Sequence, residues 1–361
     1  MPNQLARRGA LGAAVSAAVV AGAPVRAAGT ITAVRQVAYA EADAAVEVVE
    51  LPAPVPQPGE VVIAIEAAAM HLADVKFMRG EEGFDLFKLP RIMGTEGVGR
   101  VIAMGAGVTG WNIGDRVFAP QGVGTFQQQL AAPAERLVAA PEDGDADQLA
   151  LTTINGMTAY LLLEDYTAAK PGEWLVQNGA NSSVGRYLFA LARRKGVHVV
   201  GLVRRESLIP ELMATGADAV LVDTGDPNDM AAKVKAATGG APIKAGIDCV
   251  AANATTTVAR CVAEGGEVVN YGYMTGQPCH MAFVDLWRRN IRLRGMNMRN
   301  PRSRDEVQQL YVFLAGLIAD GTLKAAIAAT YPLARIKEAL AHQEQSGEAR
   351  PGKIIIRPND A

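Results

Sequence analysis

The feature that most restricts the fold is a regular alternation of short apolar runs and helical segments between residues 155 and 297. The apolar runs are WLVQNGA, HVVGLV, ADAVLVD, AGIDCVA and EVVNYGY, and a helical pattern follows each of the first four. Such alternation is typical of a parallel sheet with helices on both faces. The sequence therefore predicts an α/β fold built on a doubly wound parallel sheet in this region.

The connection after the first apolar run has part of the pattern of a dinucleotide-binding turn. Where the G-x-G-x-x-G turn has its three glycines, this chain has Ala180, Ser182 and Gly185. Small side chains let the backbone approach a diphosphate, and the free N–H groups of a helix expected from about Val184 to Lys195 can bind it. The same pattern fits an ordinary N-capped helix. The candidate diphosphate-binding residues are Ala180, Asn181, Ser182, Ser183, Val184 and Gly185.

Two arginines follow the second apolar run. A sheet that prefers NAD(H) places Asp or Glu about 20 residues after the turn, where the carboxylate accepts from the ribose 2′-OH. This chain has Arg204 and Arg205 there, and Glu206 comes only afterwards. Two guanidinium groups suit a 2′-phosphate. The pair therefore predicts NADP(H) as the cofactor, and a solvated basic helix start is the alternative.

The chain before residue 150 has a different pattern. EVVIAIEAAAM and GRVIAMGAGVTGWNIGDRVFA are short apolar runs broken by turns rich in Gly and Pro. Many short strands at this spacing favour a barrel-like β domain. The last 60 residues return to helix and strand and end in GKIIIRP.

Residues 1–28 have the composition of an export signal. Arg7-Arg8 precedes an uncharged run of Ala, Gly and Val, and Val25-Arg26-Ala27-Ala28 ends it with a small-residue cleavage pattern. This pattern predicts a twin-arginine leader and a periplasmic location. A disordered extension or a misassigned start codon would instead leave the protein cytoplasmic. The run is too short and too poor in Leu and Ile to favour a permanent membrane span.

Charge and cysteine content exclude several classes of partner. The formal net charge of −2 gives no reason to expect nucleic acid or an anionic membrane as partner. The cysteines, Cys249, Cys261 and Cys279, are odd in number and widely spaced. They favour buried thiols over a disulfide framework or a four-cysteine zinc site.

Several motifs in sequence order resemble those of the medium-chain dehydrogenase/reductases. GTEGVGRVIAMGAGVTGWNIGDRV, NGMTAYLLL, KPGEWLVQNGANSSVG, MATGADAVLVD, AEGGEVVNYGYMTGQP and GKIIIRP carry the resemblance, which covers about residues 33–358. It implies a GroES-like β-barrel-type catalytic domain at 32–154 and 298–361 and a Rossmann nucleotide-binding domain at 155–297. It also implies a homodimer that forms by edge pairing of two nucleotide-binding sheets.

The resemblance is to the zinc-free branch of this family. Zinc-dependent members carry a ligand cysteine in the segment that corresponds to Ala67–Val75 and a ligand histidine in a G-H-E motif. This chain has no cysteine in that segment, and its motif reads Gly94-Thr95-Glu96. Because a catalytic zinc needs three protein ligands, no metal is expected. The branch contains quinone oxidoreductases and 2-enoyl thioester reductases, and the NGANSSVG turn is closest to the latter.

The proton donor is the point where the chain departs from the enoyl reductases. Those proteins have a tyrosine a few residues after an N-x-S-D segment, which here reads His71-Leu72-Ala73-Asp74, and residues 75–90 contain no tyrosine. The candidate catalytic residues are therefore His71, Asp74 and Lys76, on the loop expected after EVVIAIEAAAM. Structural roles for His71 and Asp74, and a surface position for Lys76, are the alternatives.

Four further residues are expected at the nicotinamide end of the cofactor. Thr158 and Tyr160 in MTAY match positions where the family contacts the nicotinamide, and Tyr271 and Gly272 follow a late strand of the sheet. Both tyrosines also suit an ordinary core. The sequence thus predicts a zinc-free NADPH-dependent reductase of a conjugated carbonyl or quinone, and a non-catalytic NADPH-binding protein is the alternative.

Overall fold

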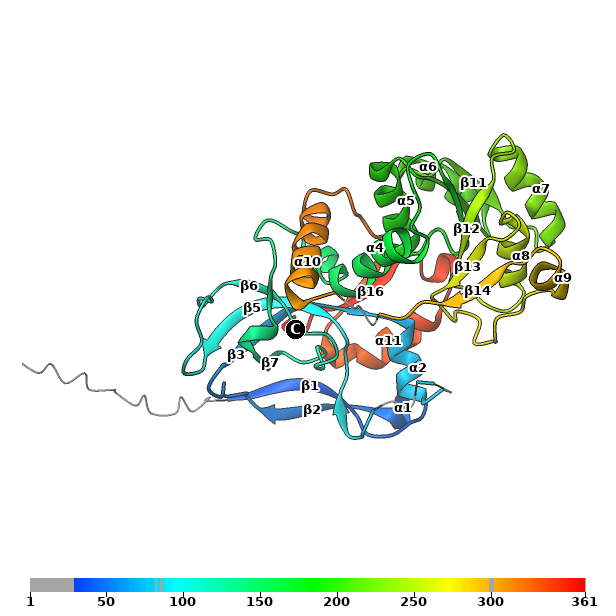
Figure 1. The fold of residues 1–361 in the computed structure, drawn as a ribbon. Coiled ribbons are helices and arrows are strands. Elements are labelled where there is room, and N and C mark those ends of the chain that lie inside the picture. Colours follow the sequence, from blue (N-terminus) through cyan, green and yellow to red (C-terminus); the bar gives the residue numbers. More distant parts are fainter. Residues whose placement is uncertain (1–28, 82, 85–86, 299–301, 361) are drawn as a thin grey trace, which may run out of the picture.

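The computed structural model describes residues 29–81, 83–84, 87–298 and 302–360. Figure 1 shows two parts: a strand-rich part, coloured blue and cyan, and a part with a central sheet and surrounding helices, coloured green and yellow. The leader expected at residues 1–28 lies outside the described residues. None of the helices in the described ranges combines the length and hydrophobicity that a bilayer crossing requires.

A six-stranded parallel sheet is the centre of the second part. Its strand order is β11-β10-β9-β12-β13-β14, so that the first strand in sequence is central. This is the 3-2-1-4-5-6 order of a Rossmann sheet. The strands are β9 (Trp174–Gln177), β10 (His198–Val203), β11 (Ala219–Val222), β12 (Ile243–Asp248), β13 (Glu267–Asn270) and β14 (Arg292–Gly295).

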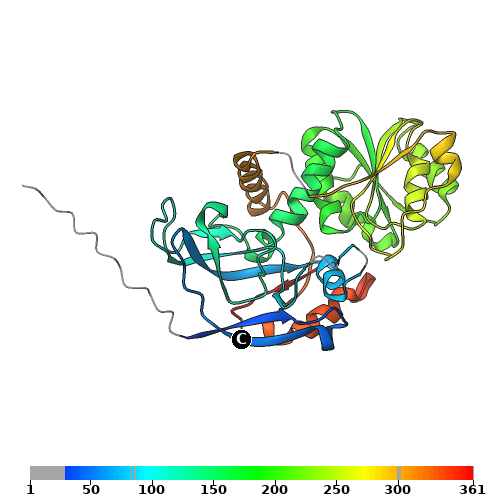
Figure 2. The same cartoon turned by 60° about the horizontal axis from the view of Figure 1, so that its bottom comes forward.

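Helices cover both faces of this sheet (Figure 2). Successive strand residues point to opposite faces: Leu175 and Val199 belong to one buried cluster, and Val176 and Val200 belong to another. The doubly wound α/β fold predicted from the alternation is therefore confirmed. The helices are α5 (Ser183–Lys195), η4 (Glu206–Leu208), α6 (Ile209–Ala214), α7 (Pro227–Ala237), α8 (Ala254–Cys261) and α9 (Phe283–Trp287).

The strand-rich part holds two further sheets. The larger has the order β15-β16-β3-β5-β6-β8, with β7 also paired to β3, and the smaller has the order β2-β1-β4. The strands are β1 (Thr30–Gln36), β2 (Val46–Pro52), β3 (Glu60–Met70), β4 (Arg91–Ile92), β5 (Gly97–Met104), β6 (Arg116–Phe118), β7 (Gln129–Pro133), β8 (Val138–Ala139), β15 (Ile327–Tyr331) and β16 (Lys353–Ile356).

The end of the chain returns to the strand-rich part. Strand β16 pairs antiparallel with β3, and Ile354 lies opposite Met70. Lys353 therefore lies beside the point where β3 ends and the next helix begins. The helices of this part are α1 (Ala42–Ala45), α2 (Leu72–Arg79), η1 (Ala134–Arg136), α3 (Ala146–Leu149), α10 (Arg304–Ala319), η5 (Leu333–Arg335), α11 (Ile336–Glu344) and η6 (Gly347–Ala349).

A helical segment with π-type turns at both ends joins the two parts. It consists of η2 (Thr152–Gly156), α4 (Met157–Leu161) and η3 (Leu162–Tyr166), and β9 follows it. Such π-type turns occur frequently at functional sites. The segment carries Thr158 and therefore leads from the strand-rich part toward the cofactor turn. The domain borders at residues 154–155 and 297–298 stay predictions.

Candidate active site

The turn after β9 has the geometry of a phosphate-binding turn. Ser182 is the N-cap of α5, and its hydroxyl accepts a hydrogen bond from the Gly185 N–H at 3.1 Å. A Cβ at Gly185 would lie 2.5 Å from the carbonyl oxygen of Ala180, so only glycine permits this close approach. Helix α5 begins one residue before the expected start, and the first N–H groups of a helix are donors for an anion.

Gly179 is a residue of this turn that the sequence pattern did not single out. Its φ is +55°, in the left-handed region, and a Cβ there would collide with Sγ of Cys249. The bend that the first glycine of a G-x-G-x-x-G turn normally makes is therefore one position earlier than the alignment on Ala180 implied. In the sequence, Gly179 directly precedes the aligned Ala180, and this glycine was the sign that the bend lies one residue earlier.

A buried carboxylate ties together the strand ends beside this turn. Asp248, at the end of β12, accepts from Asn178 Nδ2 at 2.6 Å and from Thr255 Oγ1 at 2.6 Å. It also accepts from Asn270 Nδ2 at 3.1 Å, which links the end of β13 to the same group. Its backbone donors, from Val250 and Ala251, complete the set. These bonds fix three adjacent strand ends at the edge where open α/β sheets bind ligands.

The two arginines predicted to hold a 2′-phosphate lie at the carboxyl end of β10. Arg204 is exposed, and Arg205 is half-buried, with its Nη1 atom 3.7 Å from Oε1 of Glu348 in η6. This ion pair is weak, because its two atoms are far apart and Glu348 is almost fully exposed. The Arg205 guanidinium can therefore still bind another anion. Both cations thus stand at the strand end that neighbours the phosphate turn, with their donors accessible.

The residues predicted at the nicotinamide end lie in two places. Tyr271 follows β13, and its hydroxyl is buried beside Ser182 and Cys249; burial and the neighbouring Cys249 thiol hold the pKa of Tyr271 well above its usual range. Gly272 packs against Cys249, since a Cβ there would lie 2.6 Å from the carbonyl oxygen of Cys249. Thr158 is buried in α4, and its hydroxyl lies 3.3 Å from Sδ of Met298.

His71 is the centre of a buried polar chain. Its Nε2 atom lies 2.7 Å from Oε1 of Glu96, and its Nδ1 atom lies 3.0 Å from Nζ of Lys353. The other oxygen of Glu96 accepts from Thr153 Oγ1 and from the N–H of Ile154, each at 2.8 Å. The chain therefore runs from β16 through the start of α2 to η2, the segment that leads into the cofactor-binding part.

The other two predicted catalytic residues have partners of their own. Both lie in helix α2 instead of the expected loop, because Oδ2 of Asp74 accepts from the N–H of His71 at 2.7 Å and closes the first turn. Burial raises the pKa of Asp74, although the hydrogen bond from the backbone N–H of His71 opposes this shift. Nζ of Lys76 lies 2.5 Å from Oε2 of Glu81 and 4.6 Å from the ring centroid of Tyr273.

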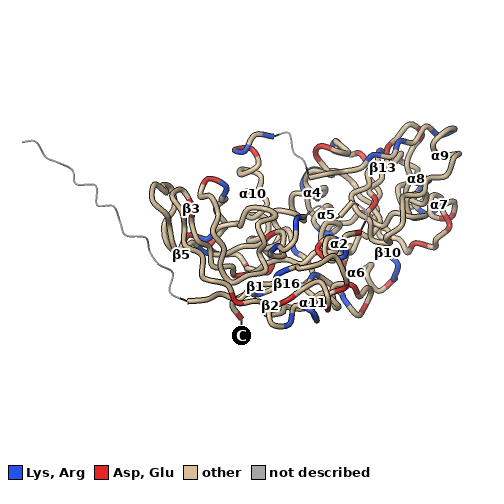
Figure 3. Tube along the Cα trace, turned by 90° about the horizontal axis from the view of Figure 1, so that it is seen from below, with Lys and Arg blue, Asp and Glu red and all other residues tan. Residues whose placement is uncertain are grey.

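Lys353 is the functional candidate that sequence reasoning missed. It begins the C-terminal strand in the GKIIIRP motif, and it reaches His71 across 282 residues of sequence. Strand β16 packs against α11, and the two lie close together when the molecule is seen from below (Figure 3). Burial lowers the pKa of Lys353 to about 8, with a smaller contribution in the same direction from Arg350, while Glu96 and Asp74 oppose it.

Three buried oxygens around this chain have no hydrogen-bond partner in the described part of the protein. They are Oδ1 of Asp74, Oγ1 of Thr95 and Oδ1 of Asn155. Thr95 and Asn155 are the sequence neighbours of Glu96 and Ile154, which themselves hydrogen-bond to each other. Because buried polar atoms in proteins are nearly always paired, this cluster is typical of a place that a ligand or water completes.

The residues of this site do not fit a catalytic zinc. The described ranges contain no group of three or more His, Cys, Asp and Glu side chains that could hold a metal ion. His71 is the one histidine at the site, and the Lys353 ammonium lies against one of its two ring nitrogens. A cation at that distance repels a metal and competes for the lone pair that would bind it.

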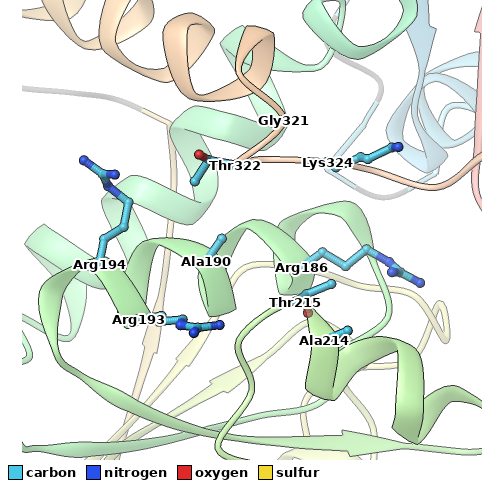
Figure 4. Close-up of a pocket in the computed structure, with 9 residues that line it drawn as sticks. All are labelled: Arg186, Ala190, Arg193, Arg194, Ala214, Thr215, Gly321, Thr322 and Lys324. Carbon is cyan, nitrogen blue, oxygen red and sulfur yellow. The ribbon is translucent and has the colours of Figure 1, made fainter.

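A hollow of about 590 Å³ beside α5 is a separate feature (Figure 4). It is lined by Arg186, Arg193, Arg194 and Lys324 together with small residues. In Figure 4 the side chain of Arg194 points away from those of Arg186 and Lys324, so the cations do not converge on one point. The hollow follows the side of a helix and not the carboxyl ends of the strands, and the candidate active site lies elsewhere.

Family models match both parts of the chain. The model described as "Alcohol dehydrogenase GroES-like domain" matches residues 57–142, and the model described as "Zinc-binding dehydrogenase" matches residues 183–315. The first match bears out the GroES-like part of the predicted fold.

Known proteins resemble the chain over most of its length. A mitochondrial enoyl-[acyl-carrier-protein] reductase of Rattus norvegicus is 31% identical over 283 residues, which cover 76% of this chain and 75% of the relative. A mycobacterial quinone oxidoreductase of solved structure is 25% identical, with a TM-score of 0.77, over 91% of this chain and 100% of its own. A mycobacterial structure in complex with NADPH is also 25% identical, with a TM-score of 0.78 over the same shares.

Proposed function

The chain belongs to the medium-chain dehydrogenase/reductases of the quinone oxidoreductase and enoyl reductase type, and from that membership we propose that it uses NADPH to reduce a conjugated acceptor without zinc. The acceptor is a quinone, an enone or an enoyl group. The observation that carries the proposal is the position of the buried His71–Glu96 pair, which η2 and α4 connect directly to the nucleotide-binding sheet.

The choice of NADP(H) is supported by the chain's own residues. The turn from Gly179 to Gly185 leads into the N-terminus of helix α5, whose first N–H groups can bind a phosphate. A side chain at Gly185 would collide with the backbone of Ala180 and disrupt this turn. Arg204 and Arg205 supply two cations at the adjacent strand end, and no acidic residue holds the corresponding position. The mycobacterial relative in complex with NADPH is consistent with this choice.

The chemistry follows from the cofactor and from where charge develops. NADPH supplies a hydride to the electron-poor carbon of the acceptor. Negative charge then builds on the conjugated oxygen, and protein donors placed there lower the barrier. The unpartnered Thr95 hydroxyl is suited to donate to that oxygen, and His71, Asp74 and Lys76 are the candidate catalytic residues from sequence. Zinc is not required, because N–H and O–H donors replace it as electrophile.

Three further parts of the proposal concern assembly, location and role. A homodimer is supported by the edge position of β14, whose four residues are all exposed.

Export is proposed from the Arg7-Arg8 leader pattern, and cell fractionation of the full-length chain tests it. A protein that binds NADPH without turnover is the competing role.

A panel of acceptors tests the proposed function. Purified, EDTA-treated protein is mixed with NADPH and either 1,2-naphthoquinone, crotonyl-CoA or a simple enone, and absorbance at 340 nm is followed. We expect NADPH oxidation with at least one acceptor and much slower oxidation of NADH. Quinone turnover alone identifies a quinone reductase, and thioester turnover identifies an enoyl reductase. Tight NADPH binding with no turnover of any acceptor would overturn the reductase assignment.

A further inference from the structure

Lys353 is the one member of the buried chain with donors left over. An ammonium group has three N–H donors, and one of them reaches His71 Nδ1 at 3.0 Å. Within the described ranges, the Lys353 ammonium forms no other hydrogen bond or ion pair, and the backbone N–H of Lys353 donates to the carbonyl oxygen of Ala326. Lys353 is half-buried, and an ammonium that has lost part of its hydration is stabilised by hydrogen-bond acceptors. Two of its three N–H donors therefore have no acceptor among the described residues.

The bonds of His71 explain why this histidine is not itself the proton donor. When Lys353 is an ammonium, it donates to Nδ1, so Nδ1 carries no hydrogen and the imidazole proton is on Nε2. Nε2–H then donates to Glu96 at 2.7 Å. Both ring nitrogens are occupied. Glu96 fixes the imidazole, and the imidazole in turn fixes the Lys353 ammonium.

The electrostatic surroundings suit an acid that works near neutral pH. The groups that face Lys353 are His71 and Asp74 at the start of α2, Glu96 before β5, and Arg350 in the segment before β16. Burial is the largest influence and lowers the pKa of the ammonium, and the two carboxylates limit that effect. A general acid is most effective when its pKa lies close to the working pH.

We propose, on the basis of the proposed reductase function, that Lys353 is the catalytic residue that protonates the reduced acceptor, while His71 and Glu96 are positioning residues. Hydride transfer would break a C–H bond of the nicotinamide of NADPH and form a C–H bond at the β-carbon, and the electron pair of the C=C bond would move to give an enolate. An N–H bond of Lys353 then breaks, and its proton forms the second C–H bond at the α-carbon. For a quinone the proton goes to the quinol oxygen. The neutral amine that remains is reprotonated by water after product leaves.

With this assignment, Lys353 takes the role of the tyrosine proton donor of the enoyl reductases, for which residues 75–90 of this chain offer no tyrosine. The donor comes from the far end of the sequence, and β16 pairs with β3 so that Lys353 meets the start of α2. Thr95 and Asn155, whose buried oxygens are unpartnered in the described protein, lie on the Glu96 side of the same chain.

Kinetics of Lys353→Met and Lys353→Arg test the assignment, with Lys324→Met as the control at an exposed lysine. NADPH oxidation with 1,2-naphthoquinone and with a simple enone is measured from pH 6 to pH 10. We expect Lys353→Met to lower kcat about 100-fold, a typical contribution of a general acid, with the NADPH Kd changed less than twofold by calorimetry. The wild-type alkaline limb near pH 8 should be absent in that variant. Lys353→Arg keeps the positive charge but cannot release a proton between pH 6 and pH 10, so it should not recover kcat.

Two outcomes overturn the assignment. If Lys353→Met keeps at least half of the wild-type kcat, Lys353 is not the proton donor. A loss confined to NADPH affinity makes it a cofactor contact instead. A readout that needs no turnover is NMR of ¹³C-methylated lysines in the NADPH-free protein, where one resonance should titrate near pH 8 and vanish in Lys353→Arg. If the wild type turns over no acceptor, the proposed function fails first, and the lysine resonance still shows whether the perturbed group exists.

Discussion

Nζ of Lys76 lies 4.6 Å from the centroid of the Tyr273 ring, so helix α2 of the strand-rich part meets the segment after β13 of the nucleotide-binding sheet. The same nitrogen is 2.5 Å from Oε2 of Glu81. Lys76 is buried, which strengthens both contacts relative to a surface lysine. The contact joins the two parts of the molecule beside the candidate site.

Because the Lys76 ammonium is engaged, we predict a mainly structural effect of Lys76→Ala. The free energy of unfolding should fall by about 1–2 kcal/mol, since a cation–π contact and a partly buried ion pair are lost. Urea denaturation measures this, with Lys324→Ala as the control. The value of kcat should fall less than tenfold. A drop of 100-fold or more at unchanged stability would instead make Lys76 the proton donor.

Removal of the arginine pair should affect one cofactor only. We expect Arg204→Ala/Arg205→Ala to weaken NADPH binding about 100-fold, because two charge-assisted contacts to the 2′-phosphate are lost at about 1.5 kcal/mol each. NADH binding should stay within twofold. Arg193→Ala/Arg194→Ala, an exposed basic pair on α5, is the matched control. Equal losses for both cofactors would refute the phosphate role.

The perturbed lysine should be visible in the pH dependence of stability. The pKa of Lys353 is about 8 in the folded protein, against an ordinary value of 10.5. Between these values the unfolded chain holds the proton and the folded protein does not, so stability rises with pH across this window. Relative to Lys353→Met, the wild type should gain up to about 3 kcal/mol between pH 8 and pH 10.5. A difference that is flat over this range would contradict the lowered pKa.

Helix α9 and strand β14 should carry the dimer contact. Phe283 and Trp287 are 71% and 73% exposed and stack on each other with ring centroids 5.6 Å apart. Exposed aromatic pairs beside a free sheet edge are typical of interfaces. We expect Phe283→Glu/Trp287→Glu to give a monomer in light scattering with an unchanged circular dichroism spectrum. Ile113→Glu, at another exposed apolar residue, is the control. A monomeric wild type would exclude this dimer.

The sequence predicted those features that depend on local pattern. Alternating apolar runs gave the parallel sheet, and the small residues before α5 located its N-terminus within one residue. The shift of the bend to Gly179 was missed because it depends on contact with Cys249 from another strand. Neither the secondary-structure propensity of the residues nor the spacing of the motif indicates such a packing contact.

The candidate site shows the same limit more strongly. His71 was identified as a residue with suitable chemistry, but its partners Glu96 and Lys353 lie 25 and 282 residues away. Their meeting depends on the pairing of β16 with β3, which sequence patterns do not specify. The predicted loop for Asp74 and Lys76 is a helix because the Asp74 carboxylate closes its first turn. The roles of these residues stay predictions.

Calorimetric titration of NADPH and of NADH into the purified, EDTA-treated chain tests the central claim most directly. We predict a saturable heat at one NADPH per chain, and binding at least ten times weaker for NADH. The absence of heat with both nucleotides would contradict the phosphate turn, the role of Arg204 and Arg205, and the reductase that depends on them.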